Sequence, residues 1–217
     1  NYATAVFYLT NRDLPQLAKS KPAHQTLVHL RPFLDQTALP NPKSETVSNT
    51  LLAVGMFRSG DKMASFKTLA NALQHVKTRD WQLNIVGAGP CEDEVKASFA
   101  RFRNQVHFVG ELDHAGVMSA MQGSDVFVWP GVNEAFGMVY LEAQSVGLCV
   151  VAEDRPGVRD VVSEQCYLVK PNDPKSFAES IENALKTINS SKIREFIATN
   201  HMRSSASITL ANAISPH

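Results

Sequence analysis

The sequence has few cysteines, no excess of either charge and no long apolar run. Its three cysteines (Cys91, Cys149 and Cys166) are widely spaced without a C-x-x-C pattern, which indicates neither a disulfide framework nor a zinc site and favours a reducing compartment. Basic and acidic side chains number 21 each, a balance that argues against nucleic-acid binding. No run approaches the ~20 apolar residues of a membrane span and no signal peptide is visible, so membrane contact is expected to be peripheral at most.

The 217 residues, 44% of them hydrophobic, are sufficient to bury a sizeable core. From residue 48 onward, short apolar strands alternate with amphipathic helices, a pattern typical of an α/β fold with a doubly wound parallel sheet covered on both faces. The expected strands are 50–55, 81–86, 106–109, 125–129, 149–152 and 167–169. The expected helices are 62–78, 91–102, a short helix capped by Asp113, 138–146, 158–162 and 174–186.

The two flanks differ from this central part. Towards the N-terminus we expect a strand at 5–9, a helix at 11–19 capped by Thr10, and a strand at 27–33. Residues 35–49 are rich in Pro, Asn, Ser and Thr and are interpreted as a linker. Towards the C-terminus, residues 193–198 and 203–214 are expected to be helical. The predicted organisation is therefore 1–47, 48–190 and 191–217, with a central domain between partial flanks.

The most informative stretch is 129–143, where two carboxylates flank a strand-to-helix junction. Glu134 follows the expected strand, and Glu142 lies about one turn inside the following helix. In open parallel sheets this edge is where ligands bind. Backbone N–H groups at the helix start favour a phosphate there. These groups belong to Phe136, Gly137, Met138 and Val139.

A second glycine-containing turn, Gly87-Ala88-Gly89, follows the strand at 81–86. It invites a dinucleotide-binding interpretation, but residue 92 is glutamate, so the third glycine of G-x-G-x-x-G is missing. No clear acidic residue for a ribose ends the next strand, which also disfavours a dinucleotide-dependent oxidoreductase. A plain tight turn and the floor of a ligand cleft both remain open for Gly87 and Gly89.

The stretch 134–143, with Glu, a small residue, Phe-Gly, apolar residues and Glu-Ala, resembles the donor-side motif of the group 1 retaining, nucleotide-sugar-dependent glycosyltransferases. These enzymes have the two-domain GT-B architecture. The resemblance continues in order over roughly 48–190. The matching segments are 52–62, 83–90, 106–112, 147–152 and 156–160.

The resemblance implies a role for each charged residue. Lys62 and Arg58 would neutralise the donor diphosphate in a metal-independent reaction, although Met56 occupies the position where the family usually has its arginine. Glu142 would accept hydrogen bonds from the two ribose hydroxyls, because a carboxylate is a pure acceptor with two oxygens. Glu134 would bind hydroxyls of the donor sugar or stabilise positive charge at the anomeric carbon.

Further residues take their expected places from the same resemblance. Gly87 and Gly89 would keep the cleft floor free of side chains, and Glu111 and Leu112 would hold the base largely through backbone atoms. Without the family context, the charged residues would be interpreted as solvated surface groups. His107 and His114 are isolated and are interpreted as structural or exposed residues. Trp129 is expected in the core or in the cleft wall.

The resemblance thus predicts the donor-binding domain of a glycosyltransferase with no cofactor and a UDP- or GDP-linked sugar as donor. The acceptor, a glycan or lipid, would bind a domain of which residues 1–47 are the end. The chain starts at Asn1 without methionine, and we expect an inactive fragment of a cytoplasmic bacterial enzyme, at most peripheral to the inner membrane face. Two alternatives stay open: a non-catalytic nucleotide-binding module and a GT-B-fold nucleotide-sugar epimerase.

Overall fold

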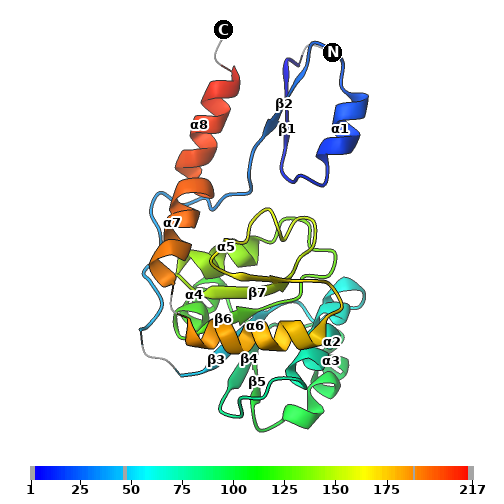
Figure 1. Ribbon diagram of the computed structural model, residues 1–217, viewed down its shortest axis with the longest axis vertical. Coiled ribbons are helices and arrows are strands. Elements are labelled where there is room, and N and C mark those ends of the chain that lie inside the picture. The colour runs from blue at the N-terminus through cyan, green and yellow to red at the C-terminus, as the bar shows by residue number, and fades with distance from the viewer. Residues whose placement is uncertain (1–2, 46–47, 188, 215–217) are drawn as a thin grey trace.

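The computed structural model in Figure 1 describes residues 3–45, 48–187 and 189–214 of the chain. Its central element is a six-stranded parallel sheet with strand order β5-β4-β3-β6-β7-β8. The strands are β3 (Thr50–Val54), β4 (Gln82–Val86), β5 (Val106–Gly110), β6 (Val126–Val128), β7 (Cys149–Glu153) and β8 (Tyr167–Val169). Because the order reverses between β3 and β6, the sheet is doubly wound, as predicted.

Helices cover both faces of the sheet. On one face α2 (Asp61–Leu73) packs against α3 (Glu92–Ser98) and α6 (Pro174–Lys186). On the other face α4 (His114–Gln122) contacts α5 (Met138–Ser145), since right-handed crossovers after the reversal place them there. Every residue of β6 and β7 is buried, which explains why these strands do not alternate and are apolar except for Glu153 at the end of β7.

Residues 3–30 form a small unit of their own. The strands β1 (Ala5–Tyr8) and β2 (Thr26–His29) pair in parallel, and α1 (Leu14–Ser20) connects them. No residue of these three elements is fully buried. Figure 1 shows this unit at the same end of the molecule as α8 (Arg203–Ile214), which follows α7 (Ser190–Asn200) and extends away from the six-stranded sheet.

Two chain segments run together between the small unit and the sheet. The N–H of Leu34 donates to the carbonyl of His201 at 2.8 Å, and Leu34 pairs with Met202 in an isolated bridge. The imidazole of His201 is fully buried, and its Nδ1 lies 2.7 Å from the carbonyl oxygen of Pro32. Burial lowers the pKa of His201 to about 4, so the ring is neutral at pH 7, with its proton on Nδ1 facing the carbonyl.

Two of the predicted helices are shorter in the structure. The carboxylate of Glu182 on α6 accepts the backbone N–H groups of Lys77 and Thr78, at 2.5 and 3.1 Å, so these residues do not extend α2, which ends at Leu73 and not at residue 78. The helix predicted at 91–102 divides into α3 and a 3-10 turn (Ala100–Phe102). The predicted helices at 138–146 and 174–186 match α5 and α6 to within one residue.

The predictions were wrong at three other places. The helix predicted at 158–162 is a series of turns ending in a bend, because the N–H of Ser163 bonds to the Gln144 side chain at 2.8 Å and does not continue a helical ladder. The first helix begins at Leu14 and not at residue 11, since the Thr10 hydroxyl donates to Asp13 and does not cap it. The strand predicted at 27–33 ends at His29, shortly before Pro32, which has no N–H group to continue a ladder.

Candidate functional site

A pocket of about 450 Å³ opens at the carboxyl ends of β3 and β4, beside the start of α5. This is the side of the sheet, and close to the point of strand reversal, where doubly wound folds bind ligands. Val54 and Val86, the last residues of β3 and β4, contribute to its apolar wall. The remaining lining residues are Gly55, Met56, Lys62, Gly87, Ala88, Glu111, Leu112, His114, Val117, Glu134, Ala135, Phe136, Gly137, Met138, Val139 and Glu142.

The pocket brings together most of the residues singled out from the sequence. Arg58 and Gly89 are the two that do not line it. The predicted residues that do are Lys62, Gly87, Glu111, Leu112, Glu134, Phe136, Gly137, Met138, Val139 and Glu142. Segments separated by more than a third of the chain length therefore meet at one edge of the sheet.

Lys62 and Glu134 form an ion pair on the pocket wall. The Nζ atom of Lys62 lies 2.7 Å from Oε2 of Glu134, and the two side chains are 19% and 20% exposed. The ammonium group also lies 5.6 Å from the ring centre of Trp129, which is fully buried beneath it and belongs to the core. The pair presents a cation for an anionic ligand group and a carboxylate for hydroxyl groups.

Glu142 faces the same pocket from the second turn of α5. Its Oε1 lies 3.8 Å from Nδ1 of His114, at the first position of α4. Burial raises the pKa of Glu142, while the nearby imidazole partly opposes that effect. Two carboxylate oxygens at this depth are suited to a pair of neighbouring hydroxyl groups.

His114 is a lining residue that the sequence interpretation left out of the site. It is exposed, as expected, but it lies beside a predicted ribose ligand. A sequence signal was available: His114 follows Asp113, whose carboxylate caps α4 by accepting the N–H of Gly116 at 2.8 Å. The cap places the start of α4 at His114, three residues after Glu111 and four after the end of β5, and therefore at the same edge of the sheet.

Close backbone packing explains both glycines of the turn after β4. Gly87 and Gly89 have φ values of +148° and +150°. A Cβ atom would lie 2.0 Å from the carbonyl oxygen of Gly55 in the first case and 2.4 Å from that of Phe57 in the second. Gly87 also lines the pocket, whereas Gly89 serves the packing of the turn against the segment after β3.

The charge of the pocket is unusual for a site that would hold a diphosphate. Lys62 is the single lysine or arginine among the described lining residues, against the three carboxylates of Glu111, Glu134 and Glu142. Arg58 is exposed outside the lining, and Met56, 54% exposed, occupies the pocket edge. The positive ends of the α5 peptide dipoles supply the other favourable field for an anion.

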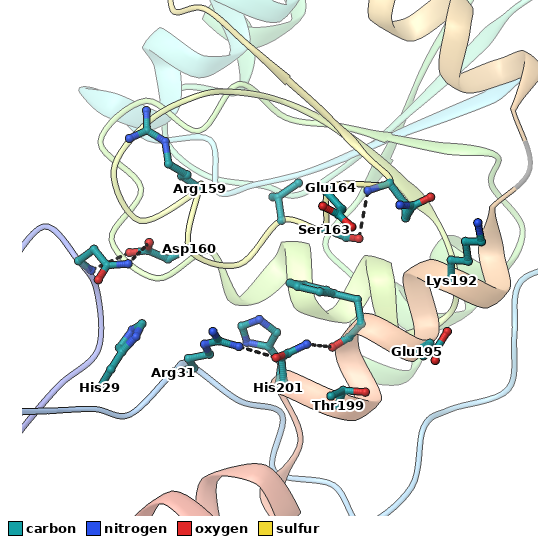
Figure 2. Close-up of a pocket in the computed structure, with 15 residues that line it drawn as sticks. His29, Arg31, Arg159, Asp160, Ser163, Glu164, Lys192, Glu195, Thr199 and His201 are labelled. Atoms are coloured by element: carbon teal, nitrogen blue, oxygen red, sulfur yellow. Dashed lines mark hydrogen bonds between the residues drawn. The ribbon is translucent and has the colours of Figure 1, made fainter.

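A larger cavity of about 780 Å³ lies elsewhere, between the small N-terminal unit, the loop 159–165 and α7 (Figure 2). The backbone and side-chain amides of Asn11 both donate to Asp160 across it, each at 2.8 Å. Both basic residues, such as Arg31 and Lys192, and acidic residues, such as Glu195, line its wall. Because none of the predicted site residues lines it, the smaller pocket is the candidate site.

The described residues contain no group of three or more His, Cys, Asp or Glu side chains placed to hold a metal ion. Among the helices of the described ranges, none is long and apolar enough to span a membrane.

Comparison with known protein families gives a match over the region that builds this pocket. The sequence model of the family described as "Glycosyl transferases group 1" matches residues 48–187. A phosphatidyl-myo-inositol mannosyltransferase of Mycobacterium tuberculosis is 34% identical over 141 residues, covering 63% of this chain and 36% of the relative. D-rhamnosyltransferase WbpZ of Pseudomonas aeruginosa is 27% identical over 157 residues, covering 68% of this chain and 41% of the relative. The chain thus spans well under half the length of these curated relatives.

Solved structures share the fold over nearly the whole chain. The lipopolysaccharide outer core galactosyltransferase WaaB in its apo form matches with a TM-score of 0.79 and 20% identity, over 98% of this chain and 62% of that one. Anabaena HepE in complex with UDP and glucose matches with a TM-score of 0.78 and 15% identity, over 99% of this chain and 64% of that one. At these identities the likeness establishes the GT-B architecture alone.

Proposed function

Because the chain belongs to the glycosyl transferases group 1 family, we propose that it binds the nucleotide-diphosphate sugar that donates the glycosyl group in a retaining, metal-independent transfer. The observation that supports this most is the convergence of Lys62, Glu134 and Glu142 on one pocket beside the N-terminus of α5. A cation, two acceptor carboxylates and free backbone N–H groups match the phosphates and hydroxyls of such a donor.

Each part of the proposed donor is assigned to the lining residues whose chemistry suits it. The diphosphate meets Lys62 and the N–H groups at the start of α5, where both fields stabilise the charge that develops on the leaving group. The ribose hydroxyls donate to Glu142. The transferred sugar faces Glu134, and the base lies against the segment of Glu111 and Leu112 after β5.

The proposed division of the chain follows from the same reasoning. Residues 48–190 form the donor domain, and the family match at 48–187 supports these limits. Residues 1–47 are the end of an acceptor-binding domain with its linker, and 191–217 are a C-terminal helical segment. The acceptor, a glycan or lipid, binds in the part of such proteins that this chain does not cover, and the reaction takes place in the cytoplasm.

One observation favours a second candidate, a nucleotide-binding module without turnover. Three glutamates and one lysine line the described pocket, so a diphosphate is held by less positive charge than its own negative charge. A module of this kind would bind the nucleoside nearly as well as the nucleoside diphosphate. A donor domain would bind the diphosphate far more tightly.

A thermal-shift panel with UDP, GDP, ADP, TDP and their sugars tests the proposal. A ligand that binds the folded chain raises its melting temperature by mass action, by an amount that grows with concentration. We expect one nucleoside diphosphate and its sugar to do so, with Lys62→Ala abolishing most of the shift. No stabilisation by any of these ligands at millimolar concentration would contradict a donor site.

A further inference from the structure

The loop that carries Glu134 is fastened to the first turns of α2 at three successive residues. The N–H of Val132 donates to the hydroxyl of Ser65 at 3.0 Å. The side-chain amide of Asn133 donates to the carboxylate of Asp61 at 2.9 Å. These two contacts directly precede the ion pair between Glu134 and Lys62, so three consecutive loop residues each make a polar contact with α2.

Asn133 has a backbone conformation that needs support. Its φ is +51°, in the left-handed region, which costs a non-glycine residue about 1 kcal/mol and which asparagine tolerates better than most. Because Asn133 immediately precedes Glu134, its conformation sets the direction in which the Glu134 side chain leaves the loop. The hydrogen bond to Asp61 fixes the Asn133 side chain in this conformation.

The opposite side of the loop is closed by the turn after β7. Gly157 lies so close that a Cβ atom would be 2.7 Å from the carbonyl oxygen of Glu134 and 2.6 Å from that of Ala135. Its φ of +89° also disfavours a side chain there. The loop is therefore held between α2 and this turn. A side chain added at Gly157 would clash with the loop, whereas the hydrogen bond from Asn133 to Asp61 can be removed without a clash.

A simpler role for Asp61 is electrostatic. It is the first residue of α2, where an acidic side chain interacts favourably with the helix dipole. That role requires only a negative charge at the helix start. It does not require a hydrogen bond between the carboxylate and Asn133. Variants that keep the hydrogen bond but lose the charge at position 61 therefore distinguish the two roles.

We propose that Asp61 and Asn133 form a positioning pair that aims Glu134 into the pocket, although neither residue lines the pocket itself. The proposal builds on the proposed donor site, because Glu134 is the group expected to meet the transferred sugar. Both members of the pair are exposed, so their bond contributes little to global stability, and variants that break it are expected to fold. Its effect is on the placement of the Glu134 carboxylate opposite Lys62.

The first test needs no ligand. The coupling between Lys62 and Glu134 is measured by a double-mutant cycle of Lys62→Gln and Glu134→Gln in urea unfolding. The cycle is repeated in two backgrounds, Asp61→Ala, which removes the acceptor of the Asn133 amide, and the exchanged pair Asp61→Asn with Asn133→Asp. We expect the coupling to fall by at least half in the first background and to return in the second, because the exchange restores an amide-to-carboxylate bond in the opposite direction.

The exchanged pair is also the control for the helix dipole, since it leaves the first position of α2 uncharged. If the exchanged pair is as defective as Asp61→Ala alone, or if neither background changes the coupling, Asp61 acts only as a terminal charge and the proposal is overturned. Asp80→Asn, at an exposed loop position, controls for the loss of one negative charge and should leave the coupling unchanged.

The second test uses calorimetry with GDP, GDP-mannose, UDP and UDP-glucose. The ratio of affinities for the sugar-bearing and sugar-free nucleotide should fall about fivefold or more in Asp61→Ala and recover in the exchanged pair, while affinity for the sugar-free nucleotide stays within about twofold. If the wild-type chain binds none of these ligands but the coupling responds as expected, the positioning pair stands and the donor-site proposal fails. If a nucleotide binds and neither readout responds, the positioning pair is wrong.

Discussion

Lys62 and Glu134 lie 72 positions apart in the sequence, yet Nζ of one and Oε2 of the other are 2.7 Å apart on the pocket wall. In the proposed donor site, a diphosphate that approaches Lys62 would therefore compete with a carboxylate already bound to it. Because the pair is partly exposed, this competition would weaken ligand binding without preventing it. The same ion pair would hold the cation in place before a phosphate arrives.

Replacement of Lys62 by alanine should reduce affinity for a nucleoside diphosphate about 10-fold or more, because a hydrogen bond to a charged group is lost. Affinity for the corresponding nucleoside should change little, since the ammonium faces the phosphates. Arg58→Ala removes the same charge from an exposed position outside the pocket and is the matched control. Calorimetry measures the affinity of both variants for the nucleoside diphosphate. An equal loss of affinity in the two would show that Lys62 does not bind the phosphates.

Replacement of Glu142 by glutamine should weaken nucleotide binding by ~1–3 kcal/mol, because one of two acceptor oxygens becomes a donor group. A 2′,3′-dideoxy nucleotide, which has no ribose hydroxyls, is the control ligand and should bind both proteins alike. An equal loss with the dideoxy nucleotide would show that Glu142 does not contact the ribose.

The same residue predicts a pH dependence of binding. Burial raises the pKa of Glu142 above its ordinary value of 4.5. Its carboxylate therefore forms at a higher pH than that of an ordinary glutamate. The affinity of the wild-type chain for a nucleotide should therefore increase as the pH rises from 4 and Glu142 ionises. The affinity of Glu142→Gln should depend less on pH. Parallel profiles in titrations from pH 4 upward would assign the dependence to another group.

Introduction of arginine at Met56 should strengthen binding of a nucleoside diphosphate by about 1 kcal/mol, roughly fivefold, because it adds a second cation to a pocket dominated by carboxylates. The gain should shrink as salt is raised, since a partly exposed charge is screened. Met56→Gln, polar but uncharged, should show neither the gain nor the salt effect. A Met56→Arg protein that binds no more tightly at low salt would place the diphosphate away from the end of β3.

Acid should lower the free energy of unfolding through His201, which connects the segment around Pro32 with the end of α7. The folded chain keeps this imidazole neutral down to about pH 4, whereas the unfolded chain protonates it below 6.5, so stability is lost as the pH falls through that range, by up to about 3 kcal/mol. His201→Asn should lose less between pH 7 and pH 4 in urea unfolding than the wild type. His75→Asn, at an exposed position, should follow the wild-type curve; identical curves for all three would contradict this assignment.

Local patterns in the sequence determined the architecture. Continuous apolar runs predicted β6 and β7, because strands covered on both faces have no polar side. Asp113 and Asp173 predicted the starts of α4 and α6, since a capping carboxylate bonds to backbone groups only three residues away. The motif around Glu134 and Glu142 likewise predicted a ligand site at the carboxyl edge of the sheet.

Only the tertiary structure decided which of the candidate side chains meet. It paired Lys62 with Glu134, left Arg58 exposed outside the pocket and placed His114 beside Glu142. It also ended α2 through Glu182, more than a hundred residues further along the chain. Periodicity and capping are interactions among neighbours in the sequence, whereas each of these outcomes depends on contacts between distant segments, which exist only once the sheet has assembled.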